Sequence, residues 1–115
     1  GAEHTAARRS VIDAHVSMWL LDRRIAQVAN DLEAGRPVSE GAPITKTALT
    51  NAEQRIFDAA HQLLGMDGIV GGDTHGVVDG WLYSRAASIY GGSAQVQRNI
   101  IGERLLGLPP EPAVR

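Results

Sequence analysis

Cysteine is absent from this 115-residue sequence, which excludes disulfide bonds, thiolate metal ligands and cysteine nucleophiles. Long hydrophobic runs are absent as well. None approaches the roughly 20 apolar residues that a membrane-spanning helix needs, and no signal-peptide pattern opens the chain. An excess of positive charge is absent too: the net charge is −2, which argues against a nucleic-acid partner, because a phosphate-binding surface needs clustered lysine and arginine. We therefore expect a cytoplasmic protein without a membrane span.

The sequence also lacks the spacings of the common catalytic and metal sites. No pair of its histidines has a ligand spacing such as HExxH, so we expect no metal site. His15 falls within an apolar pattern, and we expect it in the core or at an interface. No serine stands in a nucleophile elbow, and no carboxylate pair suggests acid–base chemistry. The glycines between residues 65 and 76 match neither the P-loop nor the dinucleotide-binding fingerprint.

Hydrophobic residues make up 43% of the chain, and their spacing indicates helices. The first helical pattern extends to about Ala34 and begins either near Ala6 or at Ser10, and Gly35 with Pro37 ends it. Residues three or four positions apart give this helix one apolar face, which predicts the side that packs on its neighbours. The face consists of Val11, His15, Met18, Leu21, Ile25, Val28 and Leu32, and is widened by Trp19 and Leu20.

Three further helices follow. The second begins at Pro43, is capped by Gly65, and shows a second apolar face made of Ile44, Ala48, Ala52, Ile56, Ala59 and Leu63. The third covers 77–89, and the fourth starts at Ser93. No segment alternates as a strand would. The sequence therefore predicts an all-α fold, an antiparallel up-and-down helical bundle in a single domain 1–115 with a frayed tail at 109–115.

The most distinctive stretch is the segment 90–109, which reads YGGSAQVQRNIIGERLLGLP. Two glycines lead into Ser93, a good helix N-cap, and Gly107 with Pro109 ends the helical pattern. Glycine backbone lets a ligand approach closely, and a helix N-terminus offers unpaired N–H donors. By physical reasoning alone, an ordinary capped helix is the commoner explanation of this pattern.

The same segment closely resembles the C-terminal signature of acyl-CoA dehydrogenases, and the resemblance extends back through residues 59–68, AAHQLLGMDG. Members of this family are FAD-dependent oxidoreductases that introduce an α,β double bond into acyl-CoA thioesters. The resemblance implies that the chain is the C-terminal helical domain of such an enzyme. It implies FAD as cofactor, acyl-CoA as substrate bound through domains outside these residues, and an electron-transfer acceptor.

Five positions match family residues that touch the adenosine and pyrophosphate parts of FAD, partly across a subunit interface. They are Gln62, Gly65, Gly68, Ser93 and Gln95. Amide and hydroxyl groups and exposed glycine backbone suit such polar ligands. Met66 departs from the family pattern, because it replaces a common glycine, and the arginine of the family's Arg-x-x-Phe-Gly motif has no match.

The catalytic base is the main departure. In many family members a glutamate directly follows the signature tyrosine, and here that position is Gly91, which has no side chain. We expect no catalytic residue in this chain and no activity from it alone. The resemblance implies a homo-oligomer, or a hetero-oligomer with a subunit that carries the base. The alternative is a stand-alone helical interaction or scaffold domain that has lost catalysis. The acyl chain, fatty or steroid, is left open.

Overall fold

The computed structural model describes residues 1–66, 70, 76–110 and 112, and every regular element in them is helical. This confirms the all-α class. The elements follow one another as α1 (Ala2–Glu33), a short 3₁₀ turn η1 (Ser39–Gly41), α2 (Ala42–Leu64), α4 (Val77–Ala86), α5 (Ala94–Ile100) and a π-helical turn η2 (Ile101–Leu105). Gly68 and His75 lie outside the described residues, as does part of the predicted frayed tail.

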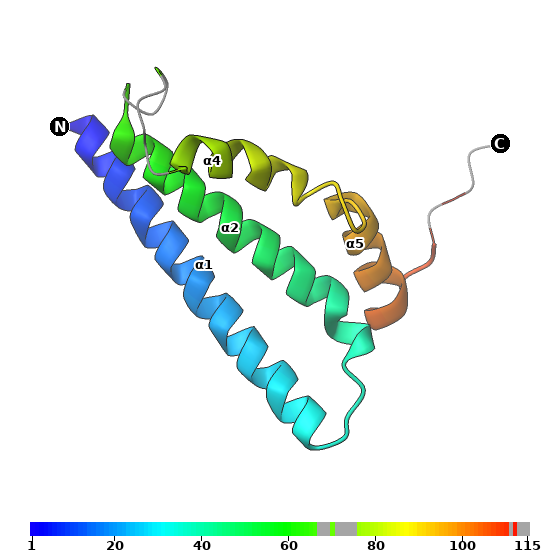
Figure 1. Cartoon of the computed structure of the whole chain (residues 1–115). Helices are drawn as coiled ribbons and strands as arrows, with labels where there is room; N and C mark the ends of the chain where they lie inside the picture. Colours follow the sequence, from blue (N-terminus) through cyan, green and yellow to red (C-terminus); the bar gives the residue numbers. More distant parts are fainter. Residues whose placement is uncertain (67–69, 71–75, 111, 113–115) are drawn as a thin grey trace.

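The helices lie side by side with α2 in the middle (Figure 1). α1 and α2 form an antiparallel pair, α4 runs back along the other side of α2, and α5 lies near the beginning of α2 (Figure 1). The radius of gyration is 17.5 Å. A compact domain of this length has a value of about 13 Å. The helices therefore form an open layer, and the position of α2 between α1 and α4 leaves two of its sides uncovered.

Small and polar residues form the contact between α1 and α2. The less exposed positions of α1 alternate at spacings of three and four, which is a heptad repeat. They are Ala7, Ser10, Ala14, Ser17, Leu21, Arg24, Val28 and Asp31. Ala14 of α1 and Ala52 and Ala59 of α2 are buried, with exposed fractions of 7%, 2% and 5%. Ala52 and Ala59 belong to the predicted apolar face of α2, and their small side chains let the two helices approach closely.

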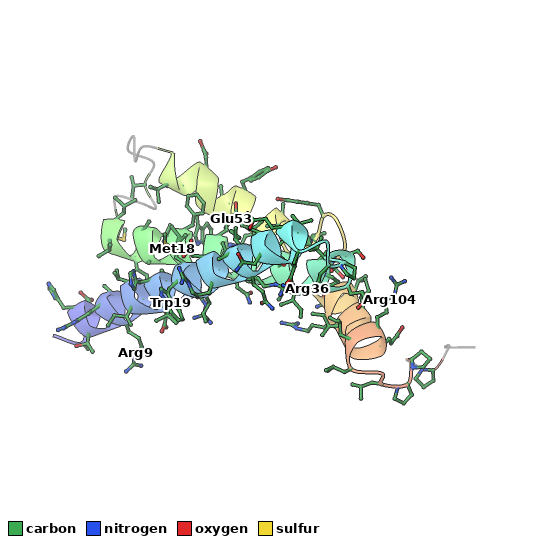
Figure 2. The ribbon with its side chains drawn as sticks, turned by 90° about the horizontal axis from the view of Figure 1, so that it is seen from below. Arg9, Met18, Trp19, Arg36, Glu53 and Arg104 are labelled. Carbon is green, nitrogen blue, oxygen red and sulfur yellow. The ribbon has the colours of Figure 1, made fainter. Side chains whose placement is uncertain are left out.

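The predicted packing face of α1 is wrong in part. Of its members only Leu21 and Val28 belong to the seam with α2, and His15 is exposed in this chain. Met18 is 50% exposed and Trp19 is 57% exposed; Figure 2 labels both on α1. The apolar periodicity was correct for a helix, but the small residues fit the close contact with α2 better than the large ones. The large side chains flank the seam instead.

The observed helix ends match the predicted ones where a capping residue is present and differ from them where none is. Gly35, Gly65 and Gly107 adopt positive φ of 68°, 56° and 66° just after helical segments. α1 begins at Ala2, earlier than predicted, because its first turns contain alanine and other helix-compatible residues and no breaker. α4 ends at Ala86 rather than at residue 89, because the chain must turn toward the two glycines that precede α5.

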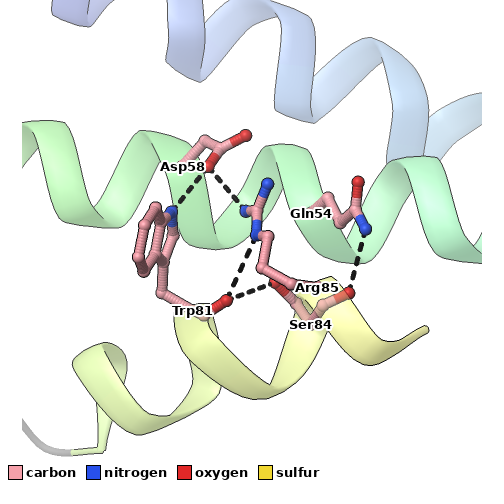
Figure 3. Close-up of polar contacts among 5 residues, drawn as sticks. All are labelled: Gln54, Asp58, Trp81, Ser84 and Arg85. Atoms are coloured by element: carbon pink, nitrogen blue, oxygen red, sulfur yellow. Dashed lines mark hydrogen bonds and ion pairs between the residues drawn. The ribbon is translucent and has the colours of Figure 1, made fainter. Parts of the chain in front are cut away.

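Polar side chains from three successive turns of α2 bind α4 or the residue that follows it. Gln54 Nε2 donates to the Ser84 carbonyl at 2.9 Å, and Thr50 Oγ1 donates to the Ala87 carbonyl at 3.3 Å. One turn further along α2, Asp58 accepts hydrogen bonds from the Trp81 indole N–H at 2.7 Å and from Arg85 Nη2 at 2.7 Å (Figure 3). Residues later in α2 bind residues earlier in α4 or its end. The contacts therefore fix the antiparallel register of the two helices.

We expect Asp58→Ala to weaken the docking of α4. The substitution removes the acceptor of two charge-assisted bonds. The carboxylate is 43% exposed. Solvent screening therefore reduces the expected loss of unfolding free energy to about 1 kcal/mol. Urea denaturation measures it. Asp22→Ala is the matched control, because Asp22 pairs with its exposed neighbour Arg23, and its loss should change the midpoint much less.

Candidate functional site

The turn from Tyr90 to Ser93 connects α4 to α5 and has a backbone that requires glycine. Gly91 and Gly92 have φ of 64° and 94°, in the left-handed region that disfavours side chains. Ser93 is extended, with ψ of 162°, and its side-chain oxygen accepts the Val96 N–H at 3.3 Å. The predicted N-cap is therefore confirmed. Gln95 follows in the first turn of α5 and is exposed.

Two side chains bind the carbonyl groups of Tyr90, Gly91 and Gly92 in this turn. Lys46 Nζ, which comes from α2, donates to the carbonyls of Tyr90 and Gly92, the latter at 2.7 Å. The Gln97 amide donates to the Gly91 carbonyl at 3.0 Å, and Gln97 is only 8% exposed. Three successive carbonyls are thus turned onto side chains of the protein.

The N–H groups of the same turn point the other way. The described residues contain no cis peptide bond, so each N–H is opposed to the carbonyl of the residue before it. The N–H groups of Gly91, Gly92 and Ser93 therefore point away from Lys46 and Gln97. Within the part of the chain that the structure describes, no hydrogen-bond acceptor is found for these three donors. The turn can therefore donate to a polar ligand.

Gly91 lies at the edge of a shallow hollow of about 360 Å³ that α2 and α5 also line. It is exposed, and the nearest atom to the position of a Cβ is Lys46 Cε at 3.5 Å. The position can neither accept nor release a proton, because glycine has no side chain. Its positive φ would also strain any residue placed there.

A second group of the predicted site residues lies at the far end of α2. Gln62 is in the last helical turn, where its Oε1 accepts a hydrogen bond from Ser10 Oγ at 2.8 Å. It borders a polar hollow of about 380 Å³ together with Asp58, His61 and Trp81. The His61 and Trp81 rings stack with centroids 4.9 Å apart. Gly65 caps α2 just beyond Gln62 and is exposed.

One chain does not bring the two groups together. The turn at Tyr90–Ser93 contacts α2 at Lys46, and Gln62 lies sixteen residues further along the same helix. At 1.5 Å per residue, this corresponds to about 24 Å. Sequence analysis missed Lys46, Gln97 and the polar contacts of α2 with α4. The available signal was the recurrence of polar residues at every fourth position of α2, from Lys46 through Thr50 and Gln54 to Asp58.

The described ranges contain neither a candidate membrane span nor a candidate metal cluster. No helix there is both long and apolar enough to cross a bilayer. The same residues contain no cluster of three or more histidine, aspartate or glutamate side chains that could hold a metal ion.

A family model and two curated relatives that match this chain all point to the acyl-CoA dehydrogenases. Residues 2–106 match the family model described as acyl-CoA dehydrogenase, C-terminal domain. Two curated relatives are both called acyl-CoA dehydrogenase IpdE1. The protein of Mycolicibacterium smegmatis is 42% identical over 72 residues and that of Mycobacterium tuberculosis is 40% identical over 72 residues. Each alignment covers 59% of this chain and 18% of the relative, so this chain corresponds to a small part of those proteins. No solved structure matches.

The family model covers nearly the whole chain, and the helices it spans are those that carry the signature residues. The 115-residue chain therefore belongs to the acyl-CoA dehydrogenase family, and residues 2–106 correspond to its C-terminal domain.

Proposed function

We propose that this chain acts as the C-terminal domain of an FAD-dependent acyl-CoA dehydrogenase, where it supplies part of the FAD site and part of the oligomer core. The observation that carries the proposal is the turn at Tyr90–Ser93: the N–H groups of Gly91, Gly92 and Ser93 find no acceptor among the residues that the structure describes, while the carbonyls of Tyr90, Gly91 and Gly92 are bound. Such a turn, followed by the exposed amide of Gln95, suits the phosphate and hydroxyl groups of a dinucleotide. Bound FAD would supply the acceptor for the hydride.

The separation of the two groups of residues supports a site shared between copies. Ser93 and Gln95 lie near the beginning of α2, whereas Gln62 and Gly65 lie at its end, about 24 Å away by helix rise. In an antiparallel pair of chains, the beginning of one α2 faces the end of the other. Each FAD would then contact Ser93 and Gln95 of one copy and Gln62 of its partner.

The open layer of helices supports association. Large apolar side chains are exposed on both uncovered sides of α2, which is unusual for a monomer. One groove, of about 500 Å³, is lined mainly by apolar residues of α1 and α2, and includes Met18, Ile25, Leu49 and Ile56. We propose that a second copy of the chain covers this groove in the assembled enzyme, with a two-fold arrangement.

The α-proton of the substrate must be removed by a residue outside this chain. The dehydrogenation needs a base beside the thioester α-carbon, and Gly91 cannot serve. We propose that the base comes from another segment or subunit of the assembled enzyme. The same glycine also favours the second candidate function, a helical scaffold domain without catalysis. Retention of FAD distinguishes the two.

The proposal predicts that Gln95→Ala lowers FAD retention in the assembled enzyme by about tenfold, because loss of one amide contact to a polar ligand costs about 1 kcal/mol or slightly more. Flavin absorbance after gel filtration measures the retained cofactor. Arg98→Ala serves as control, since Arg98 is exposed one turn further along α5. Equal retention of FAD by Gln95→Ala and the parent protein would remove the role assigned to Gln95. A parent protein without flavin would favour the scaffold function.

The chain alone is expected to have no dehydrogenase activity. When it is mixed with FAD, acyl-CoA and an electron-accepting dye, the dye should not be reduced, because Gly91 cannot act as the base.

A further inference from the structure

Lys46 makes an unusual set of contacts for a lysine in a helix. Its ammonium group donates to three backbone carbonyls, those of Ala87, Tyr90 and Gly92. It also lies 5.6 Å from the centre of the Tyr90 ring. A lysine ammonium carries three protons, so each of its donors has an acceptor. The side chain comes from the second turn of α2, and all its partners lie more than forty residues later in the chain.

Each of these contacts acts on the end of α4 or on the turn that follows. The Ala87 carbonyl lies just beyond the last residue of α4, where a positive charge is favourable to the helix dipole. The carbonyls of Tyr90 and Gly92 bracket Gly91, and the Gly91 carbonyl is bound by Gln97. Two adjacent glycines with positive φ would otherwise leave this segment many conformations. The ammonium group holds two of the three peptide planes of the turn, those of the Tyr90 and Gly92 carbonyls, in one orientation, and Gln97 holds the third.

We infer that Lys46 is the positioning residue of the cofactor-contacting turn. By binding the carbonyls of Tyr90 and Gly92, it directs the N–H groups of Gly91 and Ser93 outward, toward the ligand. The role of the turn in binding FAD rests on the proposed function, whereas the order that Lys46 imposes on the turn can be measured without flavin. Lys46 is not a catalytic residue, because it acts through the backbone of the turn.

The geometry requires a compact donor rather than positive charge alone. Three carbonyls converge on one nitrogen atom. An arginine at the same position presents its donors in a planar fork, which cannot satisfy three acceptors around a single point. Lys46→Arg therefore keeps the charge and should restore only part of the effect, whereas Lys46→Met removes both charge and donors at similar length.

The test compares variants of the 115-residue chain by NMR, and the same variants of the assembled enzyme by flavin retention. In Lys46→Met we expect the amide signals of Gly91, Gly92 and Ser93 to shift or broaden and their hydrogen exchange to change, while signals from the middle of α1 stay in place. FAD retention should fall by about tenfold to a hundredfold, as expected for the loss of charge-assisted bonds. Lys46→Arg should lie between Lys46→Met and the parent in both readouts.

Thr50→Val is the matched control. Thr50 donates to the same Ala87 carbonyl and is 8% exposed, but it does not contact Tyr90 or Gly92. Thr50→Val should leave the amide signals of the turn and the retention of FAD unchanged. The inference is overturned if Lys46→Met leaves the turn signals in place, or if Thr50→Val disturbs them equally. If Lys46→Met does not fold, the comparison of Lys46→Arg with Thr50→Val decides by the same criteria. A parent enzyme that holds no FAD contradicts the proposed function, while the NMR comparison still decides the role of Lys46.

Discussion

Replacing Gly80 by valine is expected to detach α4 from α2. A Cβ atom at this position would overlap the ring of Phe57, which faces it from α2. The overlap involves a rigid aromatic ring, so either the ring must leave its place against α4 or the two helices must move apart, and both lose packing. We expect a loss of about 3 kcal/mol of unfolding free energy, a large part of the stability of a domain of this size. Urea denaturation followed by far-ultraviolet circular dichroism measures it.

Two further variants separate the overlap from other effects of valine. Leu82→Val places the same β-branched side chain on the exposed side of α4, where Leu82 is 57% exposed, and should cost only a few tenths of a kcal/mol. Combining Gly80→Ala with Phe57→Ala removes the ring that a new methyl group would meet. The double variant should therefore be more stable than the sum of the single changes predicts. Strict additivity of the two changes would show that Gly80 and Phe57 are not in contact.

Leu49→Asp is expected to dissociate the proposed oligomer without unfolding the chain. Leu49 is 53% exposed and lies in the apolar groove that we propose a second copy covers. In the free chain its replacement disturbs little, because most of the residue already meets water. In the assembly the change removes a buried leucine and places a carboxylate in an apolar contact, which should cost about 3 kcal/mol, or about a hundredfold in the dissociation constant. Light scattering over a range of concentrations measures the mass.

Two other exposed leucines provide controls for the Leu49→Asp experiment. Leu20 is 54% exposed in a second groove on the other side of α2, and Leu108 is 55% exposed beyond the last helical turn. Leu20→Asp tests whether the second groove is also covered, and Leu108→Asp tests whether any added charge has the same effect. If the parent chain has the mass of a 12.2 kDa monomer at micromolar concentration, the proposed self-association of the chain is wrong. If Leu49→Asp keeps the parent's mass, the groove is not the interface.

The position of Gly91 limits how the chemistry of this domain can be changed. Introducing a glutamate there would supply a carboxylate, but the residue would adopt a φ of 64°, and the turn that Lys46 and Gln97 hold would have to accommodate it. The strain is of the order of 1–3 kcal/mol for a residue other than glycine. The same turn therefore opposes a side chain at residue 91, which is consistent with our proposal that the base is supplied from elsewhere.

Helix ends were predictable because their signals are local. Ser93 caps α5 through an N–H three residues away, and Gly35, Gly65 and Gly107 each follow a helical segment with a positive φ. A cap depends on the few residues around it, so a single sequence contains the information. The beginning of α1 was predicted less well, since Ala2 follows no capping side chain and nothing in the first nine residues marks a boundary.

The sequence by itself thus determined the all-α class, most helix ends, the Ser93 cap and, through its signature, the family. Only the tertiary structure decided which faces meet. Large apolar residues at helical spacing identify a helix, but small residues set how closely two helices approach, and so Ala14 rather than Met18 lies in the seam with α2. The contacts of Lys46 with Tyr90 and Gly92 were equally hidden, because they join residues more than forty positions apart. Such contacts depend on how whole helices pack, which no short stretch of sequence encodes.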